Sequence, residues 1–309
     1  MKKFVKRILI GILIFIIILV ILILLIPAQF DSTYQRALSV QYESYKQMDN
    51  NKIVLVGSSG FAFGLDIDTL EKLSGRDCSL LALHGGIGLS YMIEIAKPNI
   101  QEGDTVIFEF ADSDVDEIGA ELVLSGIENN YEMYKFFTLN NYPELLEAYP
   151  KYIGKRLEYW LFKDYVKQDY SIDYFNDKGN LILKREECTL PVDYDEEVYG
   201  IGSWNTTFNP EFIEIVNDFD EYCENLGADL LITRRLYIDE SVKSTEEEII
   251  ASDKALDDLL SAPLITNSLD IIFPRELMYD TILHTNSKGA TLRTELLYED
   301  MLSYYEISK

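Results

Sequence analysis

The stretch that decides the fold is "KIVLVGSSGFAFGLD", residues 52–66, in which an apolar run gives way to a turn of glycine and serine and then to a helix-like segment. The run 52–57 is short and continuous, which is typical of a strand buried on both faces. A strand followed by a helix is the repeating unit of a parallel sheet. The turn at 57–60 would then lie at the carboxyl end of a strand, where open α/β sheets bind their ligands.

The alternation of apolar runs and helix-like segments continues beyond this stretch. Three further runs are typical of buried strands: 79–83, 104–110 and 228–235. Helix-like segments lie at 66–75, 90–100 and 210–227, and the first and last of them end at a glycine, as helices commonly do. Strands that alternate with helices predict an α/β fold, in which helices cover both faces of a parallel sheet.

Residues 116–208 interrupt this pattern. The segment is crowded with tyrosine, phenylalanine and acidic residues, and we expect a mostly helical insertion that caps one side of the sheet. Aromatic residues at helical spacing form core more often than a ligand platform, and a groove for sugars is the alternative. The sequence therefore predicts one domain over residues 51–309, with this insertion inside it.

The N-terminus joins a basic end to a long apolar run. Four basic residues open the chain: Lys2, Lys3, Lys6 and Arg7. As a helix, the run 8–26 would be roughly 28 Å long, close to the thickness of a bilayer's hydrocarbon core. A cleavable signal peptide is the alternative, but its apolar region is shorter and "PAQFDS" offers no small-residue cleavage site. We predict an uncleaved transmembrane helix within 1–30, in a single-pass protein of the cell membrane with a cytoplasmic N-terminus and an extracytoplasmic body.

Residues 31–50 connect the apolar run to the predicted domain. Tyrosine and leucine recur there at spacings of three and four residues, at Tyr34, Leu38, Tyr42 and Tyr45, which indicates a helix. The segment is otherwise polar. We therefore predict a juxtamembrane stalk that lifts the body off the membrane.

Charge and cysteine content exclude several classes of partner. The chain has 53 acidic and 27 basic residues, for a net charge of −26. Contacts to phosphate groups need lysine or arginine, so we expect neither nucleic acid nor anionic lipid headgroups to bind the body. The three cysteines are too few and too scattered for a disulfide scaffold or a metal site, and we expect no metal and no cofactor. One disulfide with a free thiol is the alternative to three separate thiols.

Residues able to carry chemistry follow the first three predicted strands. Ser58 and Ser59 follow the first strand, His84 and Gly85 the second, and the acidic segment 109–114 the third. Because the carboxyl ends of parallel strands meet at one edge, we expect these residues to converge. Each is a weak signal alone, since a serine at such a turn is commonly a helix N-cap and no lysine follows as in a phosphate-binding loop.

A histidine near the C-terminus supplies a candidate base. The chain has two histidines, and His284 stands four residues after Asp280, just ahead of a helix-like run. A serine activated by a histidine that a carboxylate orients is the arrangement that makes a hydroxyl nucleophilic near neutral pH. If 280–284 forms a helical turn, both side chains share a face. If Asp280 points away, His284 and Ser59 would act as a dyad.

Together these blocks resemble the SGNH, or GDSL-type, hydrolase superfamily, from about residue 50 to the C-terminus apart from the insertion. The stretch "VGSSGFAFGLD" is similar to the form of the first block in membrane-anchored members of the bacterial cell envelope. The resemblance implies a three-layer α/β sandwich with a flavodoxin-like parallel sheet. It implies that Ser59 is the nucleophile, His284 the base and Asp280 the carboxylate that orients it.

The same resemblance assigns the oxyanion donors. It implies the backbone N–H groups of Ser59 and Gly85, and a third donor at Ser113, where the family has asparagine. Leu80 stands where the family has another asparagine, and the spacing from Asp280 to His284 is one residue longer than the family's D-x-x-H.

The implied function is that of a serine esterase or an O-acyltransferase. Its substrate would be the acyl groups, above all acetyl groups, of a cell-envelope polysaccharide or related polymer, or a small ester. His84 is a candidate substrate contact, and a membrane-bound O-acyltransferase is the expected partner of a transferase. The departures from the family pattern favour the alternative, an inactive scaffold of the same fold that binds an envelope polymer or a membrane acyl-transfer partner.

Overall fold

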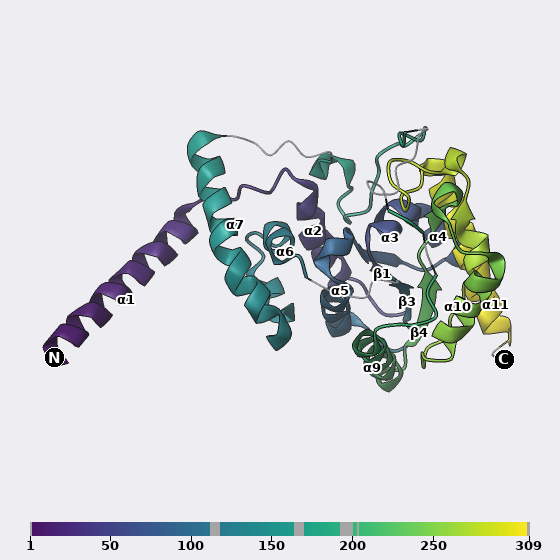
Figure 1. Ribbon diagram of the computed structural model, residues 1–309, viewed down its shortest axis with the longest axis horizontal. Helices are drawn as coiled ribbons and strands as arrows, with labels where there is room; N and C mark the ends of the chain where they lie inside the picture. Colours follow the sequence, from purple (N-terminus) through teal and green to yellow (C-terminus); the bar gives the residue numbers. More distant parts are fainter. Residues whose placement is uncertain (1, 112–117, 164–169, 192–199, 203, 308–309) are drawn as a thin grey trace.

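Four parallel strands form the centre of the computed structural model (Figure 1), which describes residues 2–111, 118–163, 170–191, 200–202 and 204–307. They are β1 (Ile53–Gly57), β2 (Cys78–Ala82), β3 (Thr105–Phe110) and β4 (Asp229–Arg234). Their order in the sheet is β2-β1-β3-β4, and each neighbouring pair is parallel. The predicted α/β class and parallel sheet are therefore present. The strands β1, β3 and β4 lie within the runs predicted for them, and β2 begins and ends one residue earlier than predicted.

Helices cover both faces of the sheet, because successive strand side chains point to opposite sides. Val54 and Val56 lie on the face covered by α2 (Ala37–Tyr45), α5 (Leu89–Ala96) and α9 (Pro210–Leu226). Ile53 and Leu55 lie on the face covered by α4 (Ile67–Ser74) and α11 (Ser287–Ile307). Figure 1 shows α2 and α5 on one side of the strands and α4 and α11 on the other.

The remaining elements surround this centre. The other helices are α1 (Lys2–Leu25), α3 (Ser59–Gly64), α6 (Ala120–Gly126), α7 (Tyr142–Phe162) and α10 (Glu246–Asp257). A second, two-stranded parallel sheet consists of β5 (Tyr237–Ile238) and β6 (Ile272–Phe273). The short 3-10 helices are η1 (Tyr34–Arg36), η2 (Gly85–Ile87), η3 (Lys97–Asn99), η4 (Tyr131–Phe136), η5 (Leu139–Asn141), η6 (Ile172–Tyr174), η7 (Asp239–Ser241), η8 (Ser268–Ile271) and η9 (Arg275–Leu277). The described parts of the insertion, residues 116–208, are largely helical, with α6 beside α7 (Figure 1).

The predicted stalk at 31–50 belongs to the body instead. Its helix, α2, buries Leu38, Tyr42 and Tyr45 in the core on one face of the sheet. The Tyr45 hydroxyl donates to the carbonyl oxygen of Ala96 over 2.7 Å. The spacing of the apolar residues therefore predicts the helix correctly, but this face packs against the sheet.

The predicted transmembrane helix at 8–26 is wrong. Among the helices of the described residues, none has the length and apolar character needed to cross a membrane. The predictions of a single-pass location in the cell membrane and of membrane contact through 8–26 depend on this helix and are therefore wrong as well.

The three cysteines carry free thiols. Burial raises the pKa of the Cys78 and Cys223 thiols to about 12 in each case, so both stay protonated at neutral pH. The sequence left open either one disulfide with a free thiol or three separate thiols, and the structure has three separate thiols.

Candidate functional site

Two adjacent serines at the end of β1 occupy different environments. Ser58 is the N-cap of α3, buried to 1% exposure, and its hydroxyl oxygen accepts the N–H of Gly60 at 3.2 Å. Ser59 is the first residue of the helix, and its side chain is partly exposed. Ser58 therefore serves the backbone as a cap, which leaves Ser59 as the serine able to meet a substrate.

A buried carboxylate explains the glycines on either side of these serines. Glu109, near the end of β3, accepts the Ser58 N–H at 2.9 Å and the Ser58 hydroxyl at 2.6 Å. A Cβ atom on Gly57 would lie 2.9 Å from the Cβ of Glu109, and one on Gly60 would overlap the Glu109 carboxylate. The strand-to-helix turn is thus shaped around Glu109, and only glycine leaves room for it at 57 and 60.

Asp280 and His284 form the predicted pair. One carboxylate oxygen of Asp280 lies 2.9 Å from Nδ1 of His284. Residues 280–284 do not form a helical turn; an antiparallel bridge between Met278 and Thr285 closes them into a loop. The second oxygen of Asp280 accepts a hydrogen bond from the Tyr170 hydroxyl. The carboxylate is therefore held from two sides, and it leaves Nε2 of His284 as the ring nitrogen able to act on a substrate or nucleophile.

The His284 ring is fixed against α3. It stacks on Phe63 with ring centroids 4.1 Å apart and an interplanar angle of 9°. The Thr285 hydroxyl donates to the Phe63 carbonyl oxygen over 2.9 Å, which ties the two segments together. Ser59 lies one helical turn before Phe63 and so on the same side of α3. Within the described residues no hydrogen bond joins the Ser59 hydroxyl to His284.

The two predicted backbone donors, Ser59 and Gly85, follow the ends of neighbouring strands. The N–H of Ser59 opens a helix, so it has no acceptor within that helix. Gly85 opens η2 directly after β2, and β2 neighbours β1 with Gly57 opposite Ala82. A Cβ atom on Gly85 would meet nothing within 4 Å, so the space before its backbone is open. Ser113, the third predicted donor, lies outside the described residues.

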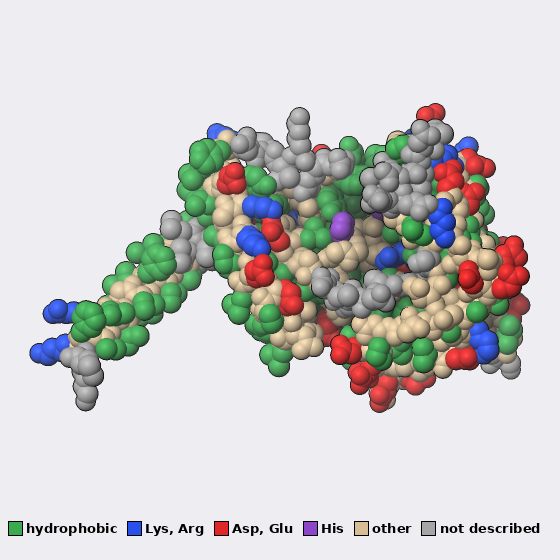
Figure 2. Space-filling view, viewed as in Figure 1, with side chains coloured by type: hydrophobic (Ala, Val, Ile, Leu, Met, Phe, Trp, Pro, Cys, Tyr) green, Lys and Arg blue, Asp and Glu red, His purple; other side chains and the backbone are tan. Residues whose placement is uncertain are grey.

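His84 lies at the same edge as His284. Its Nδ1 accepts the N–H of Gly86 at 2.9 Å, which requires the neutral ring. Although much of the side chain is exposed, partial burial lowers the pKa of His84, and the electrostatic influence of the neighbouring His284 lowers it further. Figure 2 shows histidine surface near the middle of the drawn face. His84 is thus a neutral, accessible ring close to the candidate base.

The two arginines at the end of β4, Arg234 and Arg235, have different surroundings. Arg235 donates through Nη2 to the Ser58 hydroxyl oxygen over 3.2 Å, so it reaches the turn between β1 and α3. Arg234 is fully buried, donates to Ser252 over 3.2 Å and lies 3.8 Å from an oxygen of Asp253. Arg235 belongs to the site, whereas Arg234 holds α10 against the end of β4.

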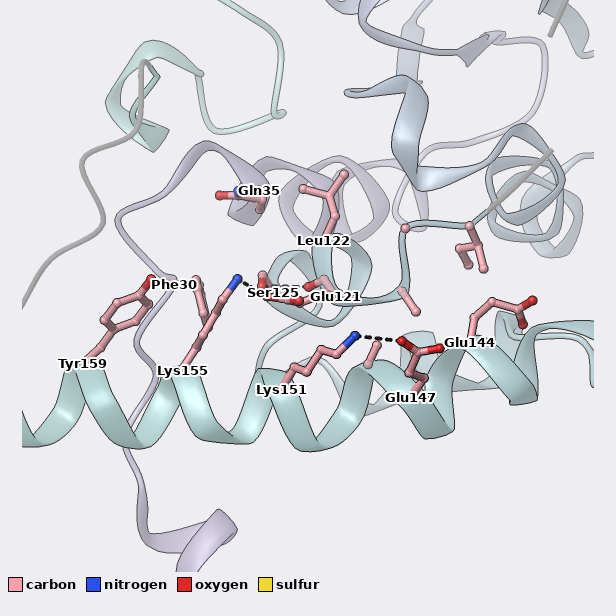
Figure 3. Close-up of a pocket in the computed structure, with 14 residues that line it drawn as sticks. Phe30, Gln35, Glu121, Leu122, Ser125, Glu144, Glu147, Lys151, Lys155 and Tyr159 are labelled. Carbon is pink, nitrogen blue, oxygen red and sulfur yellow. Dashed lines mark hydrogen bonds and ion pairs between the residues drawn. The ribbon is translucent and has the colours of Figure 1, made fainter. Parts of the chain in front are cut away.

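A pocket of about 540 Å³ lies between α6 and α7 (Figure 3). Its two lysines are each paired with a glutamate: Lys151 with Glu147 and Lys155 with Glu121. The pocket adjoins the loop after β2, because Gly119 in its wall donates its N–H to the Gly86 carbonyl oxygen. Neither Ser59 nor His284 lines it, so the pocket neighbours the candidate site but does not contain the predicted catalytic residues.

Comparison with known proteins gives no family for the chain. No protein-family model matches it, and no curated protein matches it. Among solved structures, the crystal structure of the protein YxiM from Bacillus subtilis is similar, with 13% sequence identity and a TM-score of 0.40. The similar region covers 83% of this chain and 57% of that one, so the chain spans little more than half the length of YxiM. A likeness at this level carries no argument about activity, and the SGNH resemblance stays a hypothesis.

Proposed function

We propose that the chain is a serine esterase or O-acyltransferase of SGNH type, with Ser59 as nucleophile, His284 as base and Asp280 as the carboxylate that orients the base. The observation that carries the proposal is the hydrogen bond between Asp280 and Nδ1 of His284 beside the helix that begins at Ser59. A histidine held in this way presents Nε2 in the tautomer that accepts a proton. The proposed substrate is an acyl ester, simplest as an acetyl ester of a cell-envelope polysaccharide.

In the proposed reaction, the Ser59 hydroxyl oxygen attacks the ester carbonyl carbon while its proton passes to Nε2 of His284. The oxyanion that forms accepts hydrogen bonds from the N–H groups of Ser59 and Gly85. When the bond to the leaving oxygen breaks, His284 returns the proton to that oxygen, and the acyl group stays on Ser59. Water then releases the acid in an esterase, or a sugar hydroxyl takes the acyl group in a transferase.

One observation favours a second candidate, a non-catalytic scaffold that binds an envelope polymer. In the described residues, the Ser59 hydroxyl has no hydrogen bond to His284. Catalytic hydrogen bonds are often long before substrate binds, so the two candidates are separated by measuring reactivity.

Labelling with a fluorophosphonate probe decides between the candidates. We expect the wild-type protein to be labelled on Ser59, the Ser59→Ala variant to lose labelling and the Ser58→Ala variant to keep it. Hydrolysis of 4-nitrophenyl acetate should fall by about a thousandfold or more in Ser59→Ala and His284→Ala. Circular dichroism of each variant controls for folding.

The labelling pattern also shows which part of the proposal fails: the choice of nucleophile or the catalytic activity itself. Labelling that survives Ser59→Ala but disappears in a folded Ser58→Ala variant would move the nucleophile to Ser58. A wild-type protein that reacts with neither probe nor ester would support the scaffold.

A further inference from the structure

Arg185 is a buried arginine with guanidinium donors that have no hydrogen-bond acceptor within the described residues. It is 5% exposed, and its backbone is fixed by two hydrogen bonds with Ser287: Arg185 N–H to the Ser287 hydroxyl oxygen over 3.0 Å, and Ser287 N–H to the Arg185 carbonyl oxygen over 2.8 Å. Its Nε and Nη1 atoms are shielded from solvent, and neither has a hydrogen-bond partner within the described residues. Buried charged groups in proteins are normally paired, so this group calls for an explanation.

The contact that the guanidinium does make is with an aromatic ring. Its central carbon lies 5.4 Å from the centroid of the Phe63 ring. Such a cation–π contact is favourable, but a ring face gives no acceptor for the N–H donors. Burial lowers the pKa of Arg185 to about 10, and the group still carries its charge at neutral pH. A full positive charge with unused donors therefore lies beneath the surface.

Arg185 is also one of the residues that line a pocket of about 270 Å³. Arg185 lines it together with Lys184 and the amide residues Asn176 and Asn180. Asp66 also lines it, but its oxygens already accept hydrogen bonds: Oδ1 from the Thr69 N–H, and Oδ2 from the hydroxyls of Thr69 and Thr291. Asp66 thus caps α4 and makes no hydrogen bond to Arg185 within the described residues. Asp68 is a second carboxylate in the wall.

Phe63 connects this pocket to the candidate site. The same ring that contacts the guanidinium stacks on His284. A group bound at Arg185 would therefore lie about one aromatic ring away from the candidate base. A carboxylate or phosphate supplies the acceptor oxygens that a guanidinium fork binds best.

We propose that Arg185 and this pocket bind a carboxylate or phosphate group of the substrate, so that acyl esters carrying a negative charge are preferred. The preference rests on the proposed function, whereas the binding of an anion does not. The protein as a whole is strongly acidic, so recognition depends on this local cation and not on long-range attraction.

Binding is tested first, without catalysis. Glucuronate, inorganic phosphate and neutral glucose are titrated at constant ionic strength, with thermal unfolding and calorimetry as readouts. We expect glucuronate, phosphate or both to bind and raise Tm, and glucose to have no effect. The Arg185→Met variant should lose at least about tenfold in affinity, since a charged hydrogen bond is removed. Lys288→Met removes an equal charge from an exposed neighbour of Ser287 and should bind as the wild type does.

The outcomes separate the possible sources of the anion. Binding of glucuronate alone assigns a carboxylate, binding of phosphate alone assigns a phosphate, and both support the site. Failure of both anions to bind, or unchanged binding by a folded Arg185→Met variant, would overturn the proposal. Removing an unpaired buried charge need not unfold the protein, so the variant is expected to remain testable.

The substrate preference is tested by comparing O-acetylated glucuronate with O-acetylated glucose. We expect kcat/KM to favour the acidic ester in the wild type, and Arg185→Met to reduce that preference about tenfold, in line with one charged hydrogen bond. Equal rates for both esters in an active wild type would overturn the preference. If the protein binds anions but hydrolyses no ester, the proposed function fails while the anion site stands.

Discussion

Glu109 accounts for the glycines that stand before and after the two serines. It accepts two hydrogen bonds from Ser58 and fills the space in which a side chain at Gly60 would lie. We predict that Gly60→Ala destabilises the fold by about 1–3 kcal/mol, because the new methyl group forces Glu109 out of place. Urea denaturation followed by circular dichroism measures the change.

The matched control is Gly64→Ala, at the other end of the same helix. A Cβ atom there meets nothing within 4 Å, and alanine favours helix over glycine by about 0.5–1 kcal/mol. This variant should therefore be as stable as the wild type or slightly more so. Equal destabilisation by both changes would mean that Glu109 does not set the requirement at 60.

At single positions, the sequence predicts the contact between Asp280 and His284 better than the contacts that support this pair. Asp280 and His284 pair as their spacing predicts, but through a loop closed by Met278 and Thr285, because the chain reverses there before α11 begins. Tyr170 lies in the insertion, far from Asp280 along the chain, and no local pattern indicates that it reaches this carboxylate. Long-range contacts of this kind need the fold.

The starts of β1 and β3 are joined by a buried ion pair. Nζ of Lys52 lies 2.6 Å from an oxygen of Asp104, with side chains 1% and 0% exposed. We predict that Lys52→Met costs about 3–5 kcal/mol of stability, because the Asp104 carboxylate is left buried without its cation. The free energy of unfolding in urea measures the cost.

An exposed pair gives the control for that prediction. Lys254 and Asp258 lie one turn apart on the solvent side of α10, where water screens the charges. Lys254→Met should leave the unfolding midpoint almost unchanged. If Lys52→Met were equally mild, the buried pair would not be holding the two strands together.

Among the elements, the strands of the main sheet are the ones that the sequence predicts best. Each is a short apolar run bounded by polar or glycine residues, which leaves few alternatives. The strands of the small sheet, β5 and β6, have two residues each, too few for any periodicity to appear. The helical spacing in α2 indicates an apolar face but not what covers that face, and so the segment is mistaken for a stalk.

For the molecule as a whole, the parallel order β2-β1-β3-β4 brings the carboxyl ends of β1, β2 and β3 to one edge. The sequence predicts this convergence, since it follows from parallel pairing alone. It does not predict the pocket lined by Arg185, because that pocket forms where this insertion residue meets the start of α11. Contacts between an insertion and a distant helix depend on packing that composition and periodicity do not encode.

The net charge of −26 affects the stability of the entire molecule. Figure 2 shows acidic side chains gathered over the part of the face that holds α9 and α10. Repulsion among such groups opposes the compact state, and raising the salt concentration from about 0.01 M to about 0.15 M shortens its range from about 30 Å to about 8 Å. We predict that Tm, measured by differential scanning calorimetry at neutral pH, rises by a few degrees over this range of sodium chloride, as about 1 kcal/mol of stabilisation implies for a chain of this size.

Repeating the series near the isoelectric point isolates the cause. The sequence pI is about 4.4, so near that pH the net charge vanishes and the rise in Tm should disappear. The buried pair of Lys52 with Asp104 is screened far less than exposed charges, so salt should not weaken it enough to reverse the trend. A Tm that falls with salt at neutral pH would mean that attractive surface pairs outweigh the repulsion, and a rise that persists near the isoelectric point would point to a salt effect other than charge screening.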